Sequence, residues 1–135
     1  MTKKICIVIS NYYPKISDDL LIGTLQVLKK NNFRNYKKIK VPGIFELPLI
    51  IAKNIQFYDG FIALGCVIKG ETPHFSLISK ATTNAIMNLT ITYKKPIGNG
   101  IISCLNKKQA LERSNPNKKN KGGETAKAVL SILKI

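Results

Sequence analysis

His74 is the only histidine in the chain, and it follows a segment whose residues can bind an anion. A histidine ring has an ordinary pKa near neutrality, so it can give and take protons under physiological conditions. The preceding residues are Gly70, Glu71, Thr72 and Pro73, and the last two favour the N-cap and the first position of a helix. Backbone amides at a helix start attract phosphate. The segment therefore predicts proton transfer on a small phosphorylated substrate, with a purely structural histidine as the alternative.

A phosphate site also favours an arginine, because a guanidinium group can donate two parallel hydrogen bonds to phosphate. The arginines of the chain are Arg34 and Arg113, and Arg113 ends a short helix predicted over residues 107–113. We expect Arg113 to be a phosphate-binding group. The alternative is an exposed residue that stabilises the C-terminal end of the helix dipole. The glycine patterns of P-loop and dinucleotide-binding proteins are absent from the sequence, so nucleotide binding of those kinds is not predicted.

The elements that must position these residues alternate between strand and helix. Strands are predicted from apolar runs at residues 4–10, 60–68 and 99–105, and a further strand is predicted over residues 36–41, ended by Pro42 and Gly43. Helices are predicted from apolar spacing and end signals over residues 17–30, 45–55, 73–90, 107–113 and 124–133. In the first helix we expect Ser17 as the N-cap, with Asp18 and Asp19 in the first turn, where they favour the dipole.

This alternation predicts an α/β fold in which a four-stranded parallel sheet carries helices on both faces, a three-layer α/β/α sandwich of flavodoxin-like type. The length suits one compact domain spanning residues 1–135. Ligands of such sheets bind beyond the carboxyl ends of the strands. The site is therefore expected in the loops at residues 11–14, 42–46, 69–74 and 105–121.

The net charge of +15 comes from 22 basic and 7 acidic residues and would suit an anionic partner. The lysines, however, lie in scattered pairs without interleaved aromatic residues, which favours a solvated surface over a nucleic-acid site. No apolar run is long enough to span a bilayer, and the N-terminus lacks the pattern of a signal peptide. We expect a cytoplasmic protein that binds neither nucleic acid nor membrane.

The three cysteines, Cys6, Cys66 and Cys104, are far apart in the sequence and form no C-x-x-C pair. An odd number without such a pair argues against a disulfide framework and against a zinc site. Each lies within a predicted apolar strand. We interpret all three as small buried residues, with a catalytic thiol as the weaker alternative.

Four segments together resemble the lumazine synthase family, in the family's order and near its spacing, over almost the whole chain. The segment GCVIKGETPHF at residues 65–75 is similar to the family's G-x-V-I-[RK]-G-x-T-x-H-[FY]. VPGIFELP at 41–48 resembles V-P-G-x-x-E-[IL]-P. QALER at 109–113 and NKGGETA at 120–126 resemble the E/Q-A-x-x-R helix and the N-K-G-x-[ED]-x-A segment. Each motif alone is a moderate signal, and the set is a strong one.

The resemblance implies an enzyme that condenses 5-amino-6-(ribitylamino)uracil with 3,4-dihydroxy-2-butanone 4-phosphate. The products are 6,7-dimethyl-8-ribityllumazine, phosphate and water, and neither a metal nor an organic cofactor is used. In this family the active site lies between adjacent subunits of a homopentamer, and riboflavin synthase acts next in the pathway. The partners implied are thus two small molecules and further copies of the chain.

The resemblance also implies roles for residues at matching positions. His74 is the proton-transfer residue, and Arg113 holds the phosphate together with Gly70, Glu71 and Thr72. The pyrimidine and ribityl groups contact a larger set, namely Tyr12, which stacks, Ile44, Phe45 and Glu46, which line the pocket, and Cys66, Val67, Ile68, Asn99, Lys121 and Glu124. Arg113 and Lys121 are expected to come from the neighbouring subunit.

Three features depart from the pattern of many members. Asn11 replaces an arginine before the stacking aromatic residue, and Asn99 replaces an aromatic residue, as in branches that carry G-N-G there. The chain also starts at its first core strand, without the arm that capsid-forming members add to a neighbour's sheet. We therefore expect different pyrimidine contacts, and a free pentamer or at most two pentamers face to face.

Two alternative functions remain on the sequence alone. A pentameric riboflavin synthase of the archaeal type has a related fold but lacks the G-E-T-P-H loop. An FMN-binding, flavodoxin-like module would need a Ser/Thr-rich phosphate turn after the first strand, where this chain has NYYP at residues 11–14.

Overall fold

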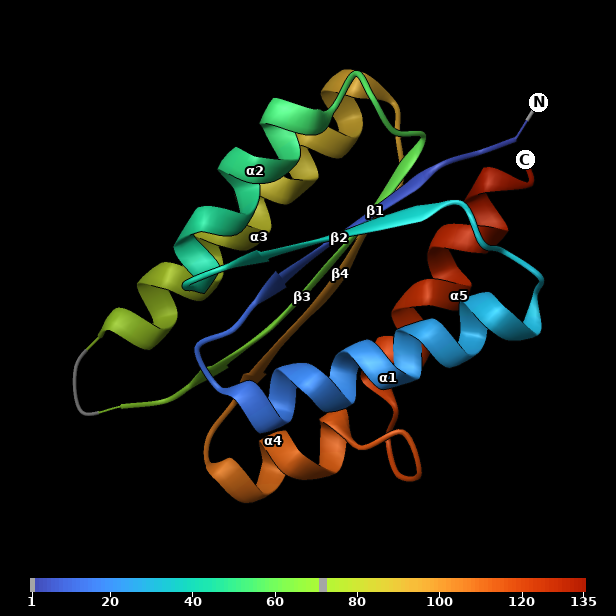
Figure 1. Cartoon of the computed structure of the whole chain (residues 1–135). Coiled ribbons are helices and arrows are strands. Elements are labelled where there is room, and N and C mark those ends of the chain that lie inside the picture. The colour runs from blue at the N-terminus through green and yellow to red at the C-terminus, as the bar shows by residue number, and fades with distance from the viewer. Residues whose placement is uncertain (1, 71–72) are drawn as a thin grey trace.

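A four-stranded parallel sheet forms the middle of the molecule. The computed structural model describes residues 2–70 and 73–135 (Figure 1). The strands are β1 (Ile5–Ser10), β2 (Tyr36–Val41), β3 (Gly60–Ile68) and β4 (Ile97–Cys104), and they lie in the order β2-β1-β3-β4. All three pairings are parallel, and in the β3–β4 pair Ala63 lies opposite Asn99. The predicted parallel sheet is confirmed.

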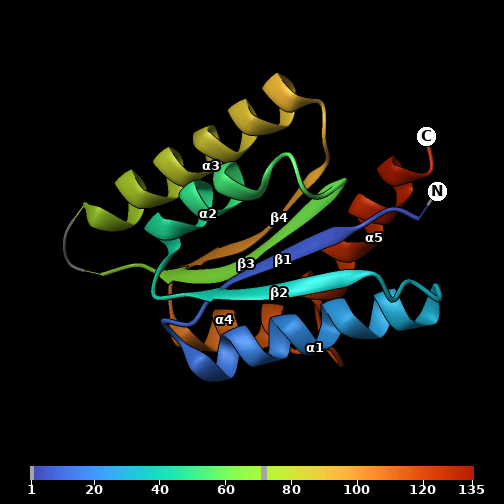
Figure 2. The same ribbon diagram turned by 45° about the horizontal axis from the view of Figure 1, so that its top comes forward.

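Helices cover both faces of the sheet, which confirms the predicted three-layer α/β/α arrangement. The short 3-10 helix η1 (Ile44–Glu46), α2 (Leu47–Asn54) and α3 (His74–Tyr93) lie on one face. The other face carries α1 (Pro14–Lys30), α4 (Lys107–Ser114) and α5 (Lys121–Leu133), as Figure 2 shows. Within the described residues, no helix is long and apolar enough to cross a membrane.

The core is divided in two by β1 and β3, whose side chains alternate between the faces. Ile5, Ile7 and Ile9 pack against α1 and α5, whereas Cys6 and Val8 pack against α2 and its neighbours. All five side chains are buried. Cys66 and Cys104 are buried too, and all three cysteines are free thiols within strands, as predicted.

The first helix begins earlier than its sequence suggests. α1 starts at Pro14, because the fixed φ of proline suits the first helical position, and Tyr13 precedes it without a side-chain cap. The prediction of Ser17 as N-cap is therefore wrong; its hydroxyl instead donates to the backbone oxygen of Ser10. Asp18 and Asp19 consequently lie beyond the first turn, and Asp19 forms an ion pair of 3.0 Å with Lys15.

The helix expected over residues 45–55 is divided into η1 and α2. Pro48 lacks the N–H that would bond back to the oxygen of Ile44 in a continuous α-helix, and the amide of Leu47 makes this turn instead.

The last strand, β4, begins two residues before the expected Asn99. The amide of Phe61 donates to the oxygen of Pro96 at 2.9 Å, so the pairing between β3 and β4 starts before that residue.

The last helix includes the glycines that were expected to precede it. α5 starts at Lys121, after Asn120, whose side chain accepts a hydrogen bond of 3.2 Å from the amide of Gly123. Gly122 faces α1 so closely that a Cβ there would lie 2.0 Å from the backbone oxygen of Leu20. The hydroxyl of Thr24 also donates to the oxygen of Gly122, at 3.1 Å. Glycine is therefore needed inside this helix, where α1 and α5 touch.

Candidate active site

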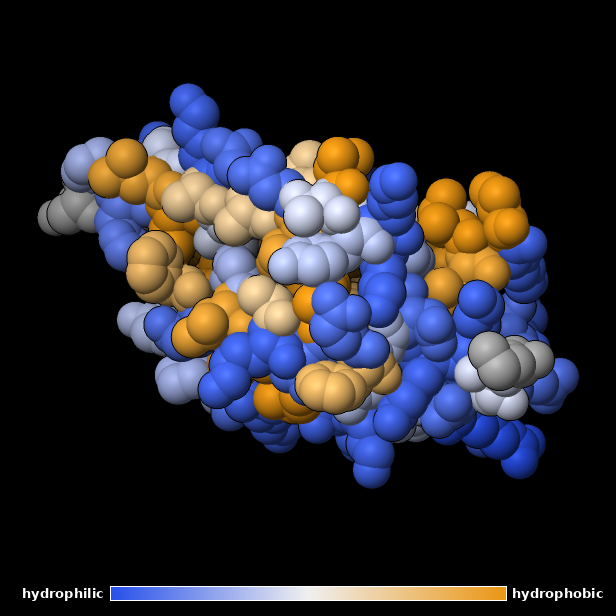
Figure 3. Space-filling model, turned by 90° about the horizontal axis from the view of Figure 1, so that it is seen from above, coloured by the Kyte–Doolittle hydropathy of each residue, from blue (hydrophilic) through white to orange (hydrophobic). Residues whose placement is uncertain are grey.

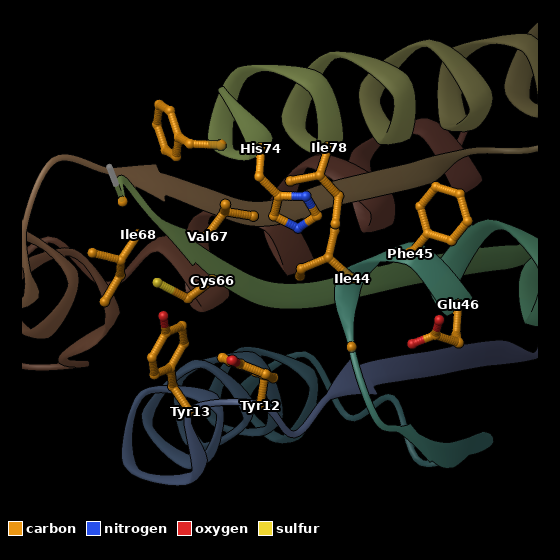
Figure 4. A pocket seen from close by; sticks show the side chains of 13 residues that line it. Tyr12, Tyr13, Ile44, Phe45, Glu46, Cys66, Val67, Ile68, His74 and Ile78 are labelled. Carbon is orange, nitrogen blue, oxygen red and sulfur yellow. The ribbon is translucent and has the colours of Figure 1, made fainter. Parts of the chain in front are cut away.

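A cleft of about 570 Å³ lies at the carboxyl ends of the strands, where the fold predicts ligand binding. The loops after β1, β2 and β3 and the first turns of α3 supply its walls (Figure 4). We call it the His74 cleft; its lining residues are Tyr12, Tyr13, Gly43, Ile44, Phe45, Glu46, Cys66, Val67, Ile68, Gly70, His74, Phe75 and Ile78. Three separate predicted loops thus meet in one place.

His74 is the first residue of α3 and so lies in the first turn, as predicted, although Pro73 is the N-cap and not the expected first helical residue. Figure 4 shows its imidazole ring pointing into the cleft, near Val67, Ile44 and Ile78. The neighbouring walls are largely aliphatic, and His74 as a residue is exposed. The geometry thus presents a group that can transfer protons to a molecule held against an apolar surface.

Two glycines leave space for the side chains of Ile44 and Glu46. A Cβ on Gly65 would lie 2.4 Å from Cδ1 of Ile44, so the bare backbone of β3 leaves space for that side chain. A Cβ on Gly43 would lie 3.0 Å from Oε1 of Glu46, so this turn leaves space for the carboxylate. Phe45, between them, is 69% exposed at the rim. The 3-10 turn therefore offers one aliphatic, one aromatic and one acidic side chain.

Two tyrosines form the wall after β1. The rings of Tyr12 and Tyr13 are 4.9 Å apart and nearly perpendicular, at 82°. Tyr12 is 69% exposed, so its ring is accessible for stacking on a flat ligand. Tyr13 was not predicted, although its place beside Tyr12 in the same turn was a signal. Burial raises the pKa of its hydroxyl, and the neighbouring Tyr12 and Cys66 add to the shift.

Other lining residues were also missed by the sequence reasoning. Phe75 and Ile78 follow His74 on α3, and Ile78 lies one turn after it, so their helical spacing could have identified them. Gly43 lines the cleft as well, within the motif that carried its neighbours.

Cys66 lies on the floor of the His74 cleft, and its environment favours the neutral thiol. The pKa of its thiol is raised from 9.0 to about 12, first by burial and then by the adjacent Cys104 thiol, while the charge of Arg113 opposes the shift. A thiol with this pKa stays protonated near neutral pH, so it contributes surface and not reactivity.

Arg113, Lys121 and Glu124 lie outside the His74 cleft. They line a second cleft of about 360 Å³ at the outer edge of β4, which we call the Arg113 cleft, together with Ile101, Ile102, Ser103 and Lys119. Nη1 of Arg113 donates to the oxygen of Ser103 at 3.0 Å and lies 3.9 Å from the Cys104 sulfur. The ammonium group of Lys121 and the carboxylate of Glu124 are 3.1 Å apart.

The remaining predicted residues are distributed differently. Gly70 lines the His74 cleft, whereas Glu71 and Thr72 lie outside the described residues. Asn99 lines neither cleft; it is exposed on β4, and its side-chain oxygen accepts from the amide of Ile101 at 3.1 Å. Across residues 2–70 and 73–135, no three His, Cys, Asp or Glu side chains gather as potential metal ligands.

The sheet order, the two helical layers and a cleft at the carboxyl ends of the strands define a flavodoxin-like α/β protein with a small-molecule site. A family model for 6,7-dimethyl-8-ribityllumazine synthase matches residues 2–135. The chain belongs to this family.

Relatives named 6,7-dimethyl-8-ribityllumazine synthase match along nearly their whole length. Identity to the protein of Bartonella tribocorum is 44% over 140 residues, which covers 100% of this chain and 92% of the relative. The protein of Bartonella bacilliformis is 43% identical over 133 residues, covering 96% and 87%. That of Buchnera aphidicola subsp. Baizongia pistaciae is 41% identical over 138 residues, covering 98% and 87%.

Proposed function

We propose that this protein is a 6,7-dimethyl-8-ribityllumazine synthase that condenses 5-amino-6-(D-ribitylamino)uracil with 3,4-dihydroxy-2-butanone 4-phosphate. The carrying observation is that the two loops with family motifs, after β2 and β3, meet the tyrosine-bearing turn after β1 around the His74 ring in one cleft. The FMN-binding alternative is not favoured, because the turn after β1 presents two tyrosines and not a phosphate cradle. A riboflavin synthase would consume the product.

In the proposed reaction the amine attacks the ketone and forms an imine with loss of one water. Phosphate is then eliminated, and the ring closes with loss of a second water. His74 moves the protons, and the cleft holds the reacting atoms together, which lowers the entropic cost of condensation. Tyr12 stacks on the pyrimidine, while Ile44 and Phe45 contact it or the ribityl chain. The Glu46 carboxylate accepts hydrogen bonds from ribityl hydroxyls. The backbone and side chains at residues 66–68 form the floor beneath them.

The phosphate is bound by Gly70 in the His74 cleft and by Arg113 in a neighbouring copy. Support comes from the separation of the two clefts within one chain, at the strand ends and at the outer edge of β4. In a closed ring every subunit can offer its Arg113 cleft to the next subunit's His74 cleft. Lys121 would then reach the pyrimidine, with Glu124 orienting its ammonium group. The family resemblance specifies a ring of five.

The surface of α3 supports contact with further copies. Among the residues described in this helix, only Thr82 and Ile86 are buried. Leu77, Met87 and Ile91 are instead 65%, 58% and 68% exposed. Figure 3, which views the side of α2 and α3, shows apolar surface between the polar groups there. Exposed apolar residues along a helix are typical of an interface.

The activity is tested by mixing the purified protein with both substrates and recording the absorbance and fluorescence of the lumazine. Inorganic phosphate should appear in equal amount. The uncatalysed condensation, measured without protein, is the control. A rate equal to that control would overturn the proposed function.

The shared site is tested by combining two impaired variants, His74→Ala and Arg113→Ala. If each site takes His74 from one chain and Arg113 from the next, random co-assembly restores both groups in about a quarter of the sites. We expect co-expressed variants to recover roughly that share of wild-type activity. Variants purified separately and then mixed without dissociation are the control. If the co-assembled rings recover no activity, both groups must instead belong to the site of one and the same chain.

A further inference from the structure

The Arg113 cleft contains more positive than negative charge, and the proposed roles of Arg113 and Lys121 do not explain the whole excess. Its charged residues are Arg113, Lys119, Lys121 and Glu124, which makes three cations and one carboxylate. Glu124 is already engaged by Lys121, 3.1 Å away. Arg113 and Lys119 therefore leave two positive charges in this cleft without a carboxylate to balance them.

The backbone around Lys119 is held firmly beside α4 and α5. The amide of Lys119 donates to the oxygen of Glu112 at 3.2 Å, and the amide of Asn120 donates to the oxygen of Asn115 at 3.1 Å. Asn120 then caps α5 through the amide of Gly123. A connection anchored on both sides fixes where the Lys119 side chain begins, although the side chain itself is exposed.

The Lys119 ammonium group is available for an outside anion. The ion pairs within the described residues are Lys15–Asp19 and Lys121–Glu124, and Lys119 belongs to neither. Arg113 differs, because Nη1 already donates to the oxygen of Ser103, which orients the guanidinium group while its other N–H donors remain. One cation in the cleft is thus oriented, and the other is a flexible point charge.

We propose that Lys119 is a second phosphate-binding residue, which acts beside Arg113 on the phosphate monoester of the substrate. A phosphate monoester carries about −1.5 to −2 charges at pH 7, so two unbalanced cations match it where one would not. Arg113 supplies directional hydrogen bonds, and Lys119 supplies the second charge. This inference rests on the proposed function, because the monoester it names is the butanone phosphate.

The test compares Lys119→Gln with Lys118→Gln. Both substitutions remove one positive charge from adjacent positions, so they change the overall field of the protein equally. Lys118, however, lines a different hollow beside α4, together with Lys107 and Lys108. We expect Lys119→Gln to raise the KM for butanone phosphate and the inhibition constant of inorganic phosphate roughly 3- to 10-fold, as for one exposed charged contact. The KM for the pyrimidine should stay within about twofold.

Two further measurements complete the test. Lys119→Arg should restore most of the phosphate affinity, because the charge is kept. Direct titration of inorganic phosphate into the wild-type protein and both Gln variants reports binding even if no lumazine is formed, which separates this inference from the proposed function. Equal phosphate affinities in wild type and Lys119→Gln, equal losses in both Gln variants, or no phosphate binding by the wild type would each overturn the proposal.

Discussion

Replacing Gly65 by alanine should reshape the His74 cleft from below. The new Cβ would lie 2.4 Å from Cδ1 of Ile44 and 3.0 Å from Cβ of Ser10. Non-bonded carbons are ordinarily about 3.5–4.0 Å apart, so Ile44 must move by roughly 1 Å or more. On its other sides Ile44 packs in the core, and it is only 5% exposed. The open space nearest to it is the cleft, so we expect its side chain to shift there.

The size of the effect follows from the packing. Forcing a methyl group into a packed core costs about 1–3 kcal/mol, and holding a side chain off its rotamer accounts for about 0.5–1.5 kcal/mol of that. For a chain of this length, each kcal/mol lowers Tm by about 3–4 °C, so a decrease of roughly 3–12 °C is expected. If the displaced Ile44 side chain weakens the binding of the substrate that it contacts by about 1.4 kcal/mol, the KM for that substrate rises about tenfold.

The assay titrates each substrate separately in the Gly65→Ala variant and records its thermal unfolding. We expect a higher KM for the ribitylaminouracil and little change for the butanone phosphate. Gly60→Ala is the control, since that glycine is at the opposite end of β3 and its Cβ would meet Val129 at 3.2 Å. It should lower Tm without changing either KM. An unchanged Tm in Gly65→Ala, or equal increases of both KM values, would refute the reasoning.

Other perturbations address the proton-transfer group, the thiols and a buried hydroxyl. His74→Ala should lower turnover by roughly 10²-fold or more while oligomer size by light scattering is unchanged; normal turnover would remove His74 from the mechanism. Burial raises the pKa of Cys6 to about 11 and of Cys66 to about 12, above the ordinary 9.0. The unfolded chain therefore loses these thiol protons at lower pH than the folded chain does, so the free energy of unfolding should fall as pH rises from about 9 towards 12. Denaturant titrations at pH 8 and 10, with Cys→Ala variants as controls, measure the part of that fall which depends on the thiols. An equal thiol contribution at both pH values would contradict the prediction. Thr82 has a buried hydroxyl without a hydrogen-bond partner among the described residues, so Thr82→Val should leave Tm equal or higher, and a fall of several degrees would show that the hydroxyl is bonded.

The strands of the sheet could be predicted from the sequence because their residue types and the turn residues after them indicate where each strand lies. β3 matches the expected bounds, since a buried parallel strand is a continuous apolar run bounded by turns. β2 matches them too, although it is a half-exposed edge strand with three lysines, because Pro42 and Gly43 mark its end. Helix starts were less predictable. Ser17 has the side chain of an N-cap, yet Pro14 starts the helix and Ser17 bonds to Ser10 instead. A local signal was outweighed by a contact with the end of β1, which the sequence does not display.

The position of the cleft could be predicted from the sequence, but the full arrangement of its residues could not. The loops that carry Tyr12, Glu46 and His74 converge because parallel strands end at one edge of the sheet, which follows from topology. The division of the predicted residues into two clefts does not follow from it. Arg113 and His74 both come after carboxyl ends, but β4 lies at the edge of the sheet and directs its residues to a separate hollow. Strand order is set by long-range packing, and no local pattern encodes it.

The contact between α1 and α5 has a consequence for how the chain folds during its synthesis. Thr24 leaves the ribosome early, but its partner oxygen on Gly122 is 98 residues further along. At about 5–20 residues per second, the first helix must wait several seconds before this surface of α1 can be covered. β1 waits as well, because it lies between β2 and β3. The segment that carries α1 thus exposes apolar surface until α5 has been made, and non-local contacts of this kind make folding slow.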